Sequence, residues 1–233
     1  AALVKADGDF VIQERYRVPF FIAQTVVQVS KESLATPRIL ALDIETYAYE
    51  KIIDFERNPI LMAAVAGVDE KGHHLRKLVT WKKFPHSLDY VETVESEKEF
   101  LIRLKNIIIE FNPDIITGYF SDGFDFPYLK ARAEKFGINF DLGLDCSSLF
   151  VSKKVGFRES EAAVTGILHL DLLKFIRNIF GKNLKTDTFS LDAVAWELLQ
   201  HKKQVVNLDF LSSAWEYHPE KLEEYFTYNM HDS

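Results

Sequence analysis

ILALDIE, at residues 39–45, is the stretch that decides the fold of this chain. It is almost wholly apolar, yet it carries Asp43 and Glu45 two positions apart. Side chains alternate between the faces of a strand, so the two carboxylates share one face while Ile44 points into the core. Two carboxylates on one face are unfavourable unless a cation lies between them, and a divalent metal ion is the usual one. The stretch therefore predicts a strand with a candidate metal site, and the competing interpretation is an ion pair at the strand end.

The spacing alone is a weak signal, because Asp54 and Glu56 repeat it. We interpret that second copy as part of a solvated loop. Asp43 and Glu45 differ because they interrupt the most apolar strand of the chain, where an unpaired charge costs several kcal/mol.

The sequence on either side of residues 39–45 predicts a single α/β domain. Apolar runs predict antiparallel neighbours of the first strand and a further short buried strand, and 3–4 spacing of apolar residues predicts helices. The strands are expected at 39–45, 60–68, 75–81 and 114–119, a hairpin at 148–157 and 162–171, and helices at 97–112, 126–136, 172–180, 191–199 and from 219 onward. This order indicates a mixed sheet of about five strands with helices on its faces and a β-hairpin insertion.

Residues 1–36 are less regular and contain short alternating stretches. We interpret them as a β-rich remnant of a preceding domain, with the main domain at residues 37–233. The first residue is Ala1 rather than Met, so we expect the chain to be a fragment of a longer protein.

Composition limits the classes of protein that are possible. The 233 residues are 47% hydrophobic and 13% aromatic, enough for one sizeable core. The chain has 28 basic and 35 acidic residues, a net charge of −7, which disfavours a protein that grips long duplex DNA but suits an acidic metal pocket. The single cysteine, Cys146, indicates a reducing compartment. The longest apolar run, Ile60 to Val68, falls well short of the roughly 20 residues of a membrane span.

Two further places carry candidate acids. Asp125 precedes Phe126-Pro127 directly after a predicted buried strand. An N-terminal helix cap is the simpler interpretation, although ligands often bind at such sheet edges. Tyr228 and Asp232 lie four residues apart and so share one face of the last helix, where an exposed helix face is the simpler interpretation.

Taken together, these three places resemble a known family. The Asp-x-Glu, Phe-Asp and Tyr-x-x-x-Asp patterns are similar, in order and spacing, to the three exonuclease motifs of the family B DNA polymerases. The resemblance runs from about Arg38 to Asp232. Residues 115–119 and 124–129 look like the family's second motif, and residues 131–135, 169–172 and 190–195 are similar to archaeal and bacterial members.

The resemblance implies a ribonuclease-H-like exonuclease domain that proofreads by hydrolysing the 3' end of single-stranded or mismatched DNA. It implies two Mg²⁺ or Mn²⁺ ions per site, which suit hard carboxylate oxygens. The implied ligands are Asp43, Glu45, Asp125 and Asp232. Tyr228 is implied to orient the attacking water, since a tyrosine with a reference pKa of about 10 is a weak base.

The resemblance also implies DNA contacts at Thr46, Phe124 and Phe120. Phe124 would be a wedge against terminal bases, and an ordinary core phenylalanine is an equally good interpretation. The family's second motif begins with Asn, where this chain has Phe120, which removes an amide expected near the substrate. Lys153, Lys154 and Arg158 on the hairpin are equally compatible with phosphate contact and with a solvated turn. Asp171 and Asp192 are expected to cap or brace helices.

Two alternatives stay open at this point. The domain could be a decayed exonuclease that serves as a scaffold or single-stranded DNA binding module, which the Phe120 departure favours and the retained acids oppose. It could also be an RNA-directed nuclease of the same fold. The expected partners are a DNA 3' end and the polymerase domain of the parent chain, with no membrane, in the cytoplasm near the nucleoid.

Overall fold

The computed structural model describes most of the 233 residues. The described residues are 3–11, 16–30, 36–48, 52–152, 160–186, 188–200 and 206–233. Among them, no helix is both long enough and apolar enough to cross a membrane.

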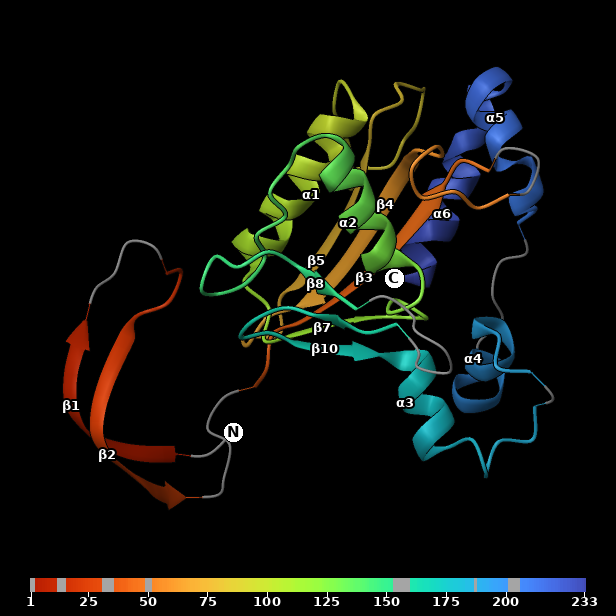
Figure 1. Ribbon diagram of the computed structural model, residues 1–233. Helices are drawn as coiled ribbons and strands as arrows, with labels where there is room; N and C mark the ends of the chain where they lie inside the picture. Colours follow the sequence, from red (N-terminus) through yellow and green to blue (C-terminus); the bar gives the residue numbers. More distant parts are fainter. Residues whose placement is uncertain are drawn as a thin grey trace.

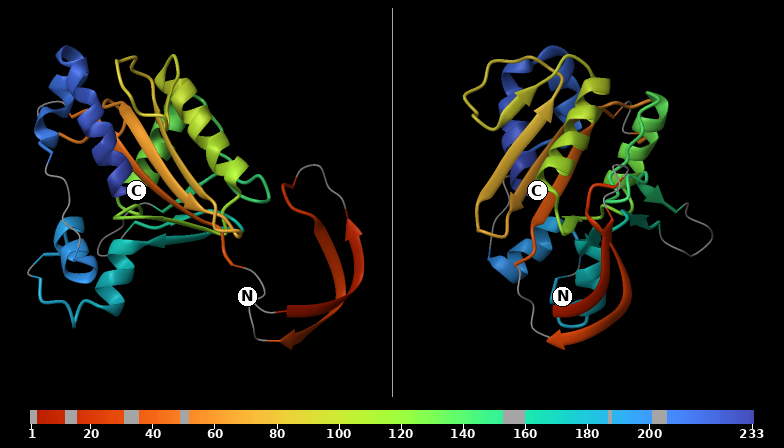
Figure 2. Two further views of the ribbon diagram at one scale, coloured as in Figure 1. Left: turned by 180° about the vertical axis from the view of Figure 1, so that it is seen from behind. Right: turned by 90° about the vertical axis from the view of Figure 1, so that its left-hand side faces the viewer.

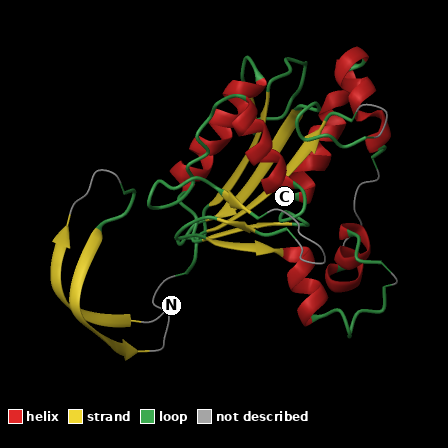
Figure 3. Ribbon diagram, in the orientation of Figure 1, coloured by secondary structure: helices red, strands yellow, loops and turns green. Residues whose placement is uncertain are grey.

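A six-stranded mixed sheet forms the centre of the fold (Figures 1 and 3). Its strands lie in the order β10-β7-β3-β4-β5-β6. They are β3 (Ile39–Thr46), β4 (Ile60–Val68), β5 (His74–Thr80), β6 (Val91–Thr93), β7 (Ile115–Gly118) and β10 (Leu168–Asp171). β4 pairs antiparallel with β3 and β5, whereas β7 pairs parallel with β3 and β10, and β6 runs parallel to β5. The expected α/β class is confirmed, but the expected five strands become six because the short strand β6 extends the edge.

Helices cover both faces of this sheet, as the opposite views in Figures 1 and 2 show. On one face Leu40, Leu42 and Ile44 of β3 pack with residues of α1 (Glu97–Phe111) and α2 (Asp125–Lys135). On the other face, residues of β4 and β5 pack with α5 (Leu211–Tyr217) and α6 (Leu222–Asp232). β3 therefore has one face in the core and the other directed toward α6.

Local capping explains where the helices begin and end. Ser96 accepts a hydrogen bond from the Glu99 N–H at the start of α1, and Asn112 ends α1 in the left-handed conformation (φ 52°). Asn tolerates that conformation, and the following Pro113 cannot continue a helix. Ser190 caps α4 (Leu191–Leu199) by accepting a hydrogen bond from the Ala193 N–H. Three short elements precede α6 in the C-terminal region: 3-10 helices at Leu208–Phe210 and Pro219–Lys221, with α5 between them.

The predicted hairpin is shorter than expected. Its arms are β8 (Phe150–Val151) and β9 (Ala162–Ala163), which pair antiparallel. The chain then turns at Val164–Ile167, and β10 leaves the hairpin to pair with β7, before α3 (Leu172–Ile179). The hairpin residues Lys153, Lys154 and Arg158 lie outside the described residues.

The N-terminal strands form a separate ribbon. β1 (Leu3–Val11) and β2 (Phe20–Ser30) pair antiparallel and belong to neither of the other two sheets (Figure 1). This agrees with the β-rich character expected for the segment. The described connection to the main domain is made by Arg17, which bonds to the carbonyl of Gly143 at 2.7 Å and to Asp141 at 3.0 Å.

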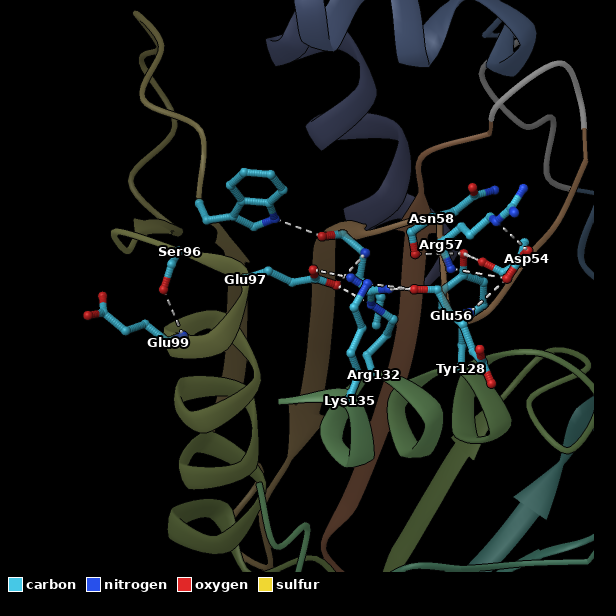
Figure 4. Close-up of polar contacts among 12 residues, drawn as sticks. Asp54, Glu56, Arg57, Asn58, Ser96, Glu97, Glu99, Tyr128, Arg132 and Lys135 are labelled. Atoms are coloured by element: carbon cyan, nitrogen blue, oxygen red, sulfur yellow. Dashed lines mark hydrogen bonds and ion pairs between the residues drawn. The ribbon is translucent and has the colours of Figure 1, made fainter. Parts of the chain in front are cut away.

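A buried ion pair joins α1, α2 and the start of β4 (Figure 4). The guanidinium of Arg132 donates to both carboxylate oxygens of Glu97, at 2.7 and 2.5 Å, and the two side chains are 3% and 7% exposed. Glu97 also accepts from the Ile60 N–H at 2.9 Å, and Arg132 donates to the Glu56 carbonyl at 2.5 Å. Each charge therefore takes part in several hydrogen bonds, which lowers the penalty for burying it.

The loop that Arg132 holds contains the second Asp-x-Glu copy. The Asp54 carboxylate accepts from the backbone N–H groups of Glu56 and Arg57, each at 3.0 Å. The interpretation of this copy as part of a loop is confirmed.

We predict that Arg132→Ala lowers the free energy of unfolding by about 3–5 kcal/mol, because it leaves the Glu97 carboxylate buried and unpaired. Chemical denaturation monitored by circular dichroism measures the effect. Lys83→Ala is the matched control, since Lys83 and Glu95 form an ion pair at 3.1 Å whose side chains are 76% and 74% exposed. Exposed pairs contribute little. Equal effects of the two substitutions would show that the buried pair has no special role.

Candidate functional site

Strand register places the two acids of β3 on the face that α6 covers. Asp43 lies opposite Ala64 and Glu45 opposite Met62 of β4. Residues that lie opposite each other in neighbouring strands share a face, and Ala64 and Met62 belong to the cluster that packs against α6. The carboxylates are therefore separated from the core of α1 and α2, as alternation along the strand predicts.

Asn229 of α6 meets these acids. Its amide Nδ2 donates to Asp43 Oδ2 at 2.6 Å, and the residue is fully buried. Its other polar atom, Oδ1, has no hydrogen-bond partner in the described part of the chain. A buried amide oxygen without a donor is uncommon in proteins, and its chemistry suits a hard cation or a water molecule. Sequence reasoning did not identify Asn229; the available signal was a lone amide on the buried face of the last helix.

The acids influence one another strongly. Burial raises the pKa of Asp43 well above its usual value, and the charges of Asp125, Glu45 and Asp232 raise it further. The hydrogen bond from Asn229 acts in the opposite direction. Asp43 is thus the centre of a group that brings together carboxylates from β3, α2 and α6.

Asp125 reaches this group from the first turn of α2. Its Oδ1 accepts from the Ile44 N–H at 3.1 Å, beyond the last residue of β3 that pairs with β7. The expected helix-cap role is wrong, because Phe124 occupies the N-cap position and no side chain caps this helix. Burial raises the pKa of Asp125 to about 7, the Ile44 N–H opposes this rise, and the charge of Asp171 adds to it.

Tyr228 and Asp232 come from α6. Tyr228 is 7% exposed and belongs to the buried face of the helix, so the interpretation of an exposed helix face is wrong for this residue. Asp232 is partly exposed in the last turn and contributes to the raised pKa of Asp43. Leu222, Tyr225, Phe226 and Met230 of the same helix are buried and pack against the sheet.

The acids are close enough to interact electrostatically but do not form a ready-made cage. Within the described ranges, no group of three or more His, Cys, Asp or Glu side chains stands in an arrangement that could already hold a metal ion. Like-charged carboxylates repel one another, so a cation is needed to draw them together.

Two of the three expected DNA contacts have intramolecular partners. The Thr46 hydroxyl forms a hydrogen bond with Tyr128, whose pKa burial raises to about 12. The Phe124 ring is half-buried against the rings of Phe55, at 6.5 Å, and Tyr128, at 5.3 Å. Phe124 therefore packs at the margin of the core, which supports the interpretation of a core phenylalanine without excluding contact with a substrate.

Phe120 has a different environment. It is 50% exposed and lies in the turn between β7 and α2, the turn that leads to Asp125. Its φ of 63° is in the left-handed region, which costs a residue other than glycine or asparagine roughly 1–2 kcal/mol. The Phe120 carbonyl accepts from the N–H groups of Gly123 and Phe124, each at 3.0 Å. The strained conformation is therefore part of the turn that begins α2.

A buried polar network that sequence reasoning missed anchors the same turn. The Asp122 N–H donates to Asp171 Oδ2 at 3.0 Å, while the Asp122 carboxylate accepts from Lys174 Nζ and from the Ala162 N–H, each at 2.6 Å. Asp171 also caps α3 by accepting from the Lys174 N–H at 3.1 Å, which confirms its expected structural role. The network links the turn to β9 and α3 and so fixes where Asp125 stands.

Comparison with known proteins identifies the family. The family described as "DNA polymerase family B, exonuclease domain" matches residues 21–194. A DNA polymerase of Pyrococcus horikoshii is 39% identical over 194 residues, which are 83% of this chain and 14% of that protein. One from Thermococcus kodakarensis is 37% identical over 196 residues, 84% of this chain and 11% of that protein. The chain therefore spans only a small part of these relatives.

The solved structures agree with this assignment at the level of the fold. The family B DNA polymerase from the hyperthermophilic archaeon Pyrobaculum calidifontis superposes with a TM-score of 0.73 at 22% identity. The similarity covers 99% of this chain and 27% of that structure. Together, the family match, the relatives and the shared fold show that this chain belongs to the exonuclease domain family of the family B DNA polymerases.

Proposed function

We propose that Asp43, Glu45, Asp125 and Asp232 hold two divalent metal ions, Mg²⁺ or Mn²⁺, and that with Tyr228 they form the catalytic centre of a 3'→5' exonuclease. Exonuclease domains of this family generally use divalent metals. The observation that carries the proposal is the meeting of three elements at β3: Asp43 Oδ2 accepts from Asn229 of α6 at 2.6 Å, and Asp125 of α2 accepts from the N–H of Ile44, the residue between Asp43 and Glu45, at 3.1 Å. Four mutually repelling carboxylates cost stability in a structural role and are useful where cations bind them.

The residues fit such ions by their chemistry. The donors are carboxylate oxygens, which Mg²⁺ and Mn²⁺ prefer. The unpartnered Asn229 Oδ1 lies on the residue that bonds to Asp43, so the surroundings of the acids are incompletely satisfied in the described structure. Divalent ions at such a site stabilise the attacking and leaving oxygens of an in-line displacement at phosphorus.

The chain's own groups have separable tasks in this proposal. Asn229 holds Asp43 in place through its 2.6 Å bond, and the Ile44 N–H holds Asp125 at 3.1 Å. Tyr228 lies one helical turn before Asp232 and orients the attacking water through its hydroxyl. Thr46 and Phe124 contact the DNA end from the rim of the site.

The substrate proposed is the 3' end of single-stranded or mismatched DNA. Relatives of this chain carry the printed name DNA polymerase and are several times longer. We propose that residues 37–233 form the exonuclease domain, that residues 1–36 belong to a preceding domain, and that the polymerase domain of the same parent chain is the partner that delivers the DNA end. The site of action is then the DNA of the cytoplasm, at the nucleoid.

A decayed exonuclease that binds single strands is the second candidate, favoured by Phe120 in the place of Asn. The presence of all four acids and Tyr228 argues against it. An RNA-directed nuclease of this fold is the third candidate. Comparing the digestion of DNA and RNA strands distinguishes it from the other two.

The first prediction is that the chain digests single-stranded DNA from its 3' end when Mg²⁺ or Mn²⁺ is present, and that Asp43→Ala and Glu45→Ala each abolish this activity. Digestion of end-labelled DNA and RNA strands of matched sequence measures the rate, the end from which nucleotides are released and the preference for DNA over RNA. Glu56→Ala is the matched control, since it alters the second Asp-x-Glu copy at an exposed side chain. Release from the 5' end, or full activity of Asp43→Ala, would show that the site is wrongly assigned.

The second prediction concerns pH in metal-free buffer. The folded-state pKa of Asp125 is about 7 and exceeds the unfolded value of 3.8, so the native state binds more protons between these values. Stability should therefore fall by an amount on the order of a few kcal/mol as pH rises from about 4 to about 8. Asp125→Asn should flatten this decline, and Mg²⁺ should restore stability mainly at the higher pH, where the carboxylates are ionised.

Thermal unfolding across this pH range, with and without Mg²⁺, measures both effects. Asp145→Asn is the control, because hydrogen bonds from Ser147 lower the pKa of Asp145 and its titration falls below the range. A stability that rises across the range, or an Asp125→Asn slope equal to that of the parent chain, would contradict the prediction.

The third prediction is that Phe120→Asn raises the turnover number by roughly 10²-fold, since one lost substrate-positioning contact costs a few kcal/mol in the transition state. The substitution should also raise stability slightly, because Asn tolerates the left-handed conformation better than Phe does. Steady-state digestion and thermal unfolding measure the two effects. An unchanged or lower turnover number would remove the basis for assigning a rate defect to Phe120.

A further inference from the structure

The aromatic side chain of Phe120 is exposed to solvent, and packing in the core does not explain its position. The residue is 50% exposed, whereas Phe124 in the same turn packs against Phe55 and Tyr128. Its backbone adopts the left-handed conformation, which side chains of this size rarely adopt. The fold therefore holds a large apolar side chain at the surface through an unfavourable backbone conformation.

The position of the ring is set by Gly123. A Cβ atom added to Gly123 would lie 2.3 Å from Cζ and 2.4 Å from Cε2 of the Phe120 ring. The ring thus packs directly on the Gly123 backbone, which supports it from one side. The absence of a side chain at position 123 is what allows this placement.

The turn that carries this ring is the one that delivers Asp125 to the acids of β3. The Ser121 carbonyl accepts from the Phe126 N–H at 3.1 Å, and a Cβ atom at Gly118 would lie 2.8 Å from the Leu42 carbonyl oxygen. The start of the turn therefore lies against the residue that precedes Asp43. The turn that bears the Phe120 ring thus starts next to β3 and ends at Asp125, so it borders the place where a DNA end would be bound by the proposed function.

We propose that the Phe120 ring is a stacking platform for the unpaired base at the 3' end of the substrate, an inference that rests on the proposed exonuclease function. Any base has a flat π surface that an aromatic side chain can stack on without reading sequence. Larger bases offer more surface, so purine ends bind more tightly than pyrimidine ends. Phe120 thus lowers the turnover number because it replaces an amide, but it increases the affinity for DNA and sets a preference for the terminal base.

Binding of short 5'-fluorescent DNA strands, with EDTA present to prevent hydrolysis, tests this platform. The strands differ only at the 3' end, which carries adenine, thymine or an abasic nucleotide. The parent chain should bind them with affinity decreasing in that order. Phe120→Leu should weaken binding of the adenine end by about tenfold, within the range measured for loss of base stacking, and leave binding of the abasic end unchanged. Phe120→Tyr, which retains the ring, should bind like the parent chain.

Two further variants separate stacking from a general effect on the turn. Gly123→Ala should displace the ring and reproduce the base-dependent loss while Phe120 itself is retained. Phe10→Leu changes another exposed ring, 75% exposed on β1, and should have no effect on any strand. Thermal unfolding confirms that each variant is folded.

The outcomes distinguish the two proposals. If the parent chain shows no metal-dependent digestion, the exonuclease function itself is wrong. If digestion occurs but Phe120→Leu binds the adenine end as tightly as the parent chain does, the stacking proposal is overturned and the exonuclease function stands. An equal loss for all three ends, the abasic one included, also overturns stacking, because it shows a contact that does not involve the base.

Discussion

The alternation of β3 is the constraint on which the rest of this structure depends. Leu40, Leu42 and Ile44 belong to the core under α1 and α2, so Asp43 and Glu45 have to face α6. A slip of one residue in the pairing with β4 would exchange the two sets, turning the apolar residues toward α6 and burying both charges in the core under α1 and α2. The penalty for that slip fixes the register, and the register in turn decides which helix can contribute the remaining groups of the site.

The chain handles buried charge in two opposite ways. Glu97 and Arg132 neutralise each other and also bond to nearby backbone groups, so their contribution is to hold α1, α2 and β4 together. Asp43 accepts a hydrogen bond from a neutral donor, Asn229, and the charges of other acids raise its pKa. The first arrangement favours a rigid scaffold, and the second favours binding of a cation. The rigid pair lies on the opposite face of the sheet from Asp43, so the repulsion among the acids acts away from the contacts that hold α1, α2 and β4 together.

Sequence patterns predicted the parts of the fold that repeat along the chain, and missed those that depend on few residues. The alternation of β3 and the 3–4 spacing of α1 are long enough to be recognised. Strand β6 has three residues, too few to show a period. The sequence therefore predicted five strands where the sheet has six. The order and spacing of the motifs identified the four candidate acids, and their roles are the proposal made above. Asn229 and the Asp122 network could not be predicted, because their partners come from distant segments that only the folded chain brings together.

The turn between β7 and α2 explains how the departure at position 120 is tolerated. Its path is determined by main-chain groups and by Asp122, whose carboxylate is held by Lys174 and by the Ala162 N–H. The carbonyl of Phe120 takes part in the turn whatever its side chain is, since it accepts from the Gly123 and Phe124 N–H groups. A change of side chain at this position therefore alters what the turn presents to a substrate, while the position of Asp125 is set by the Ile44 N–H and the buried network. The placement of an acid and the chemistry of the surface beside it are thus controlled by different residues of one turn, and each can change without the other.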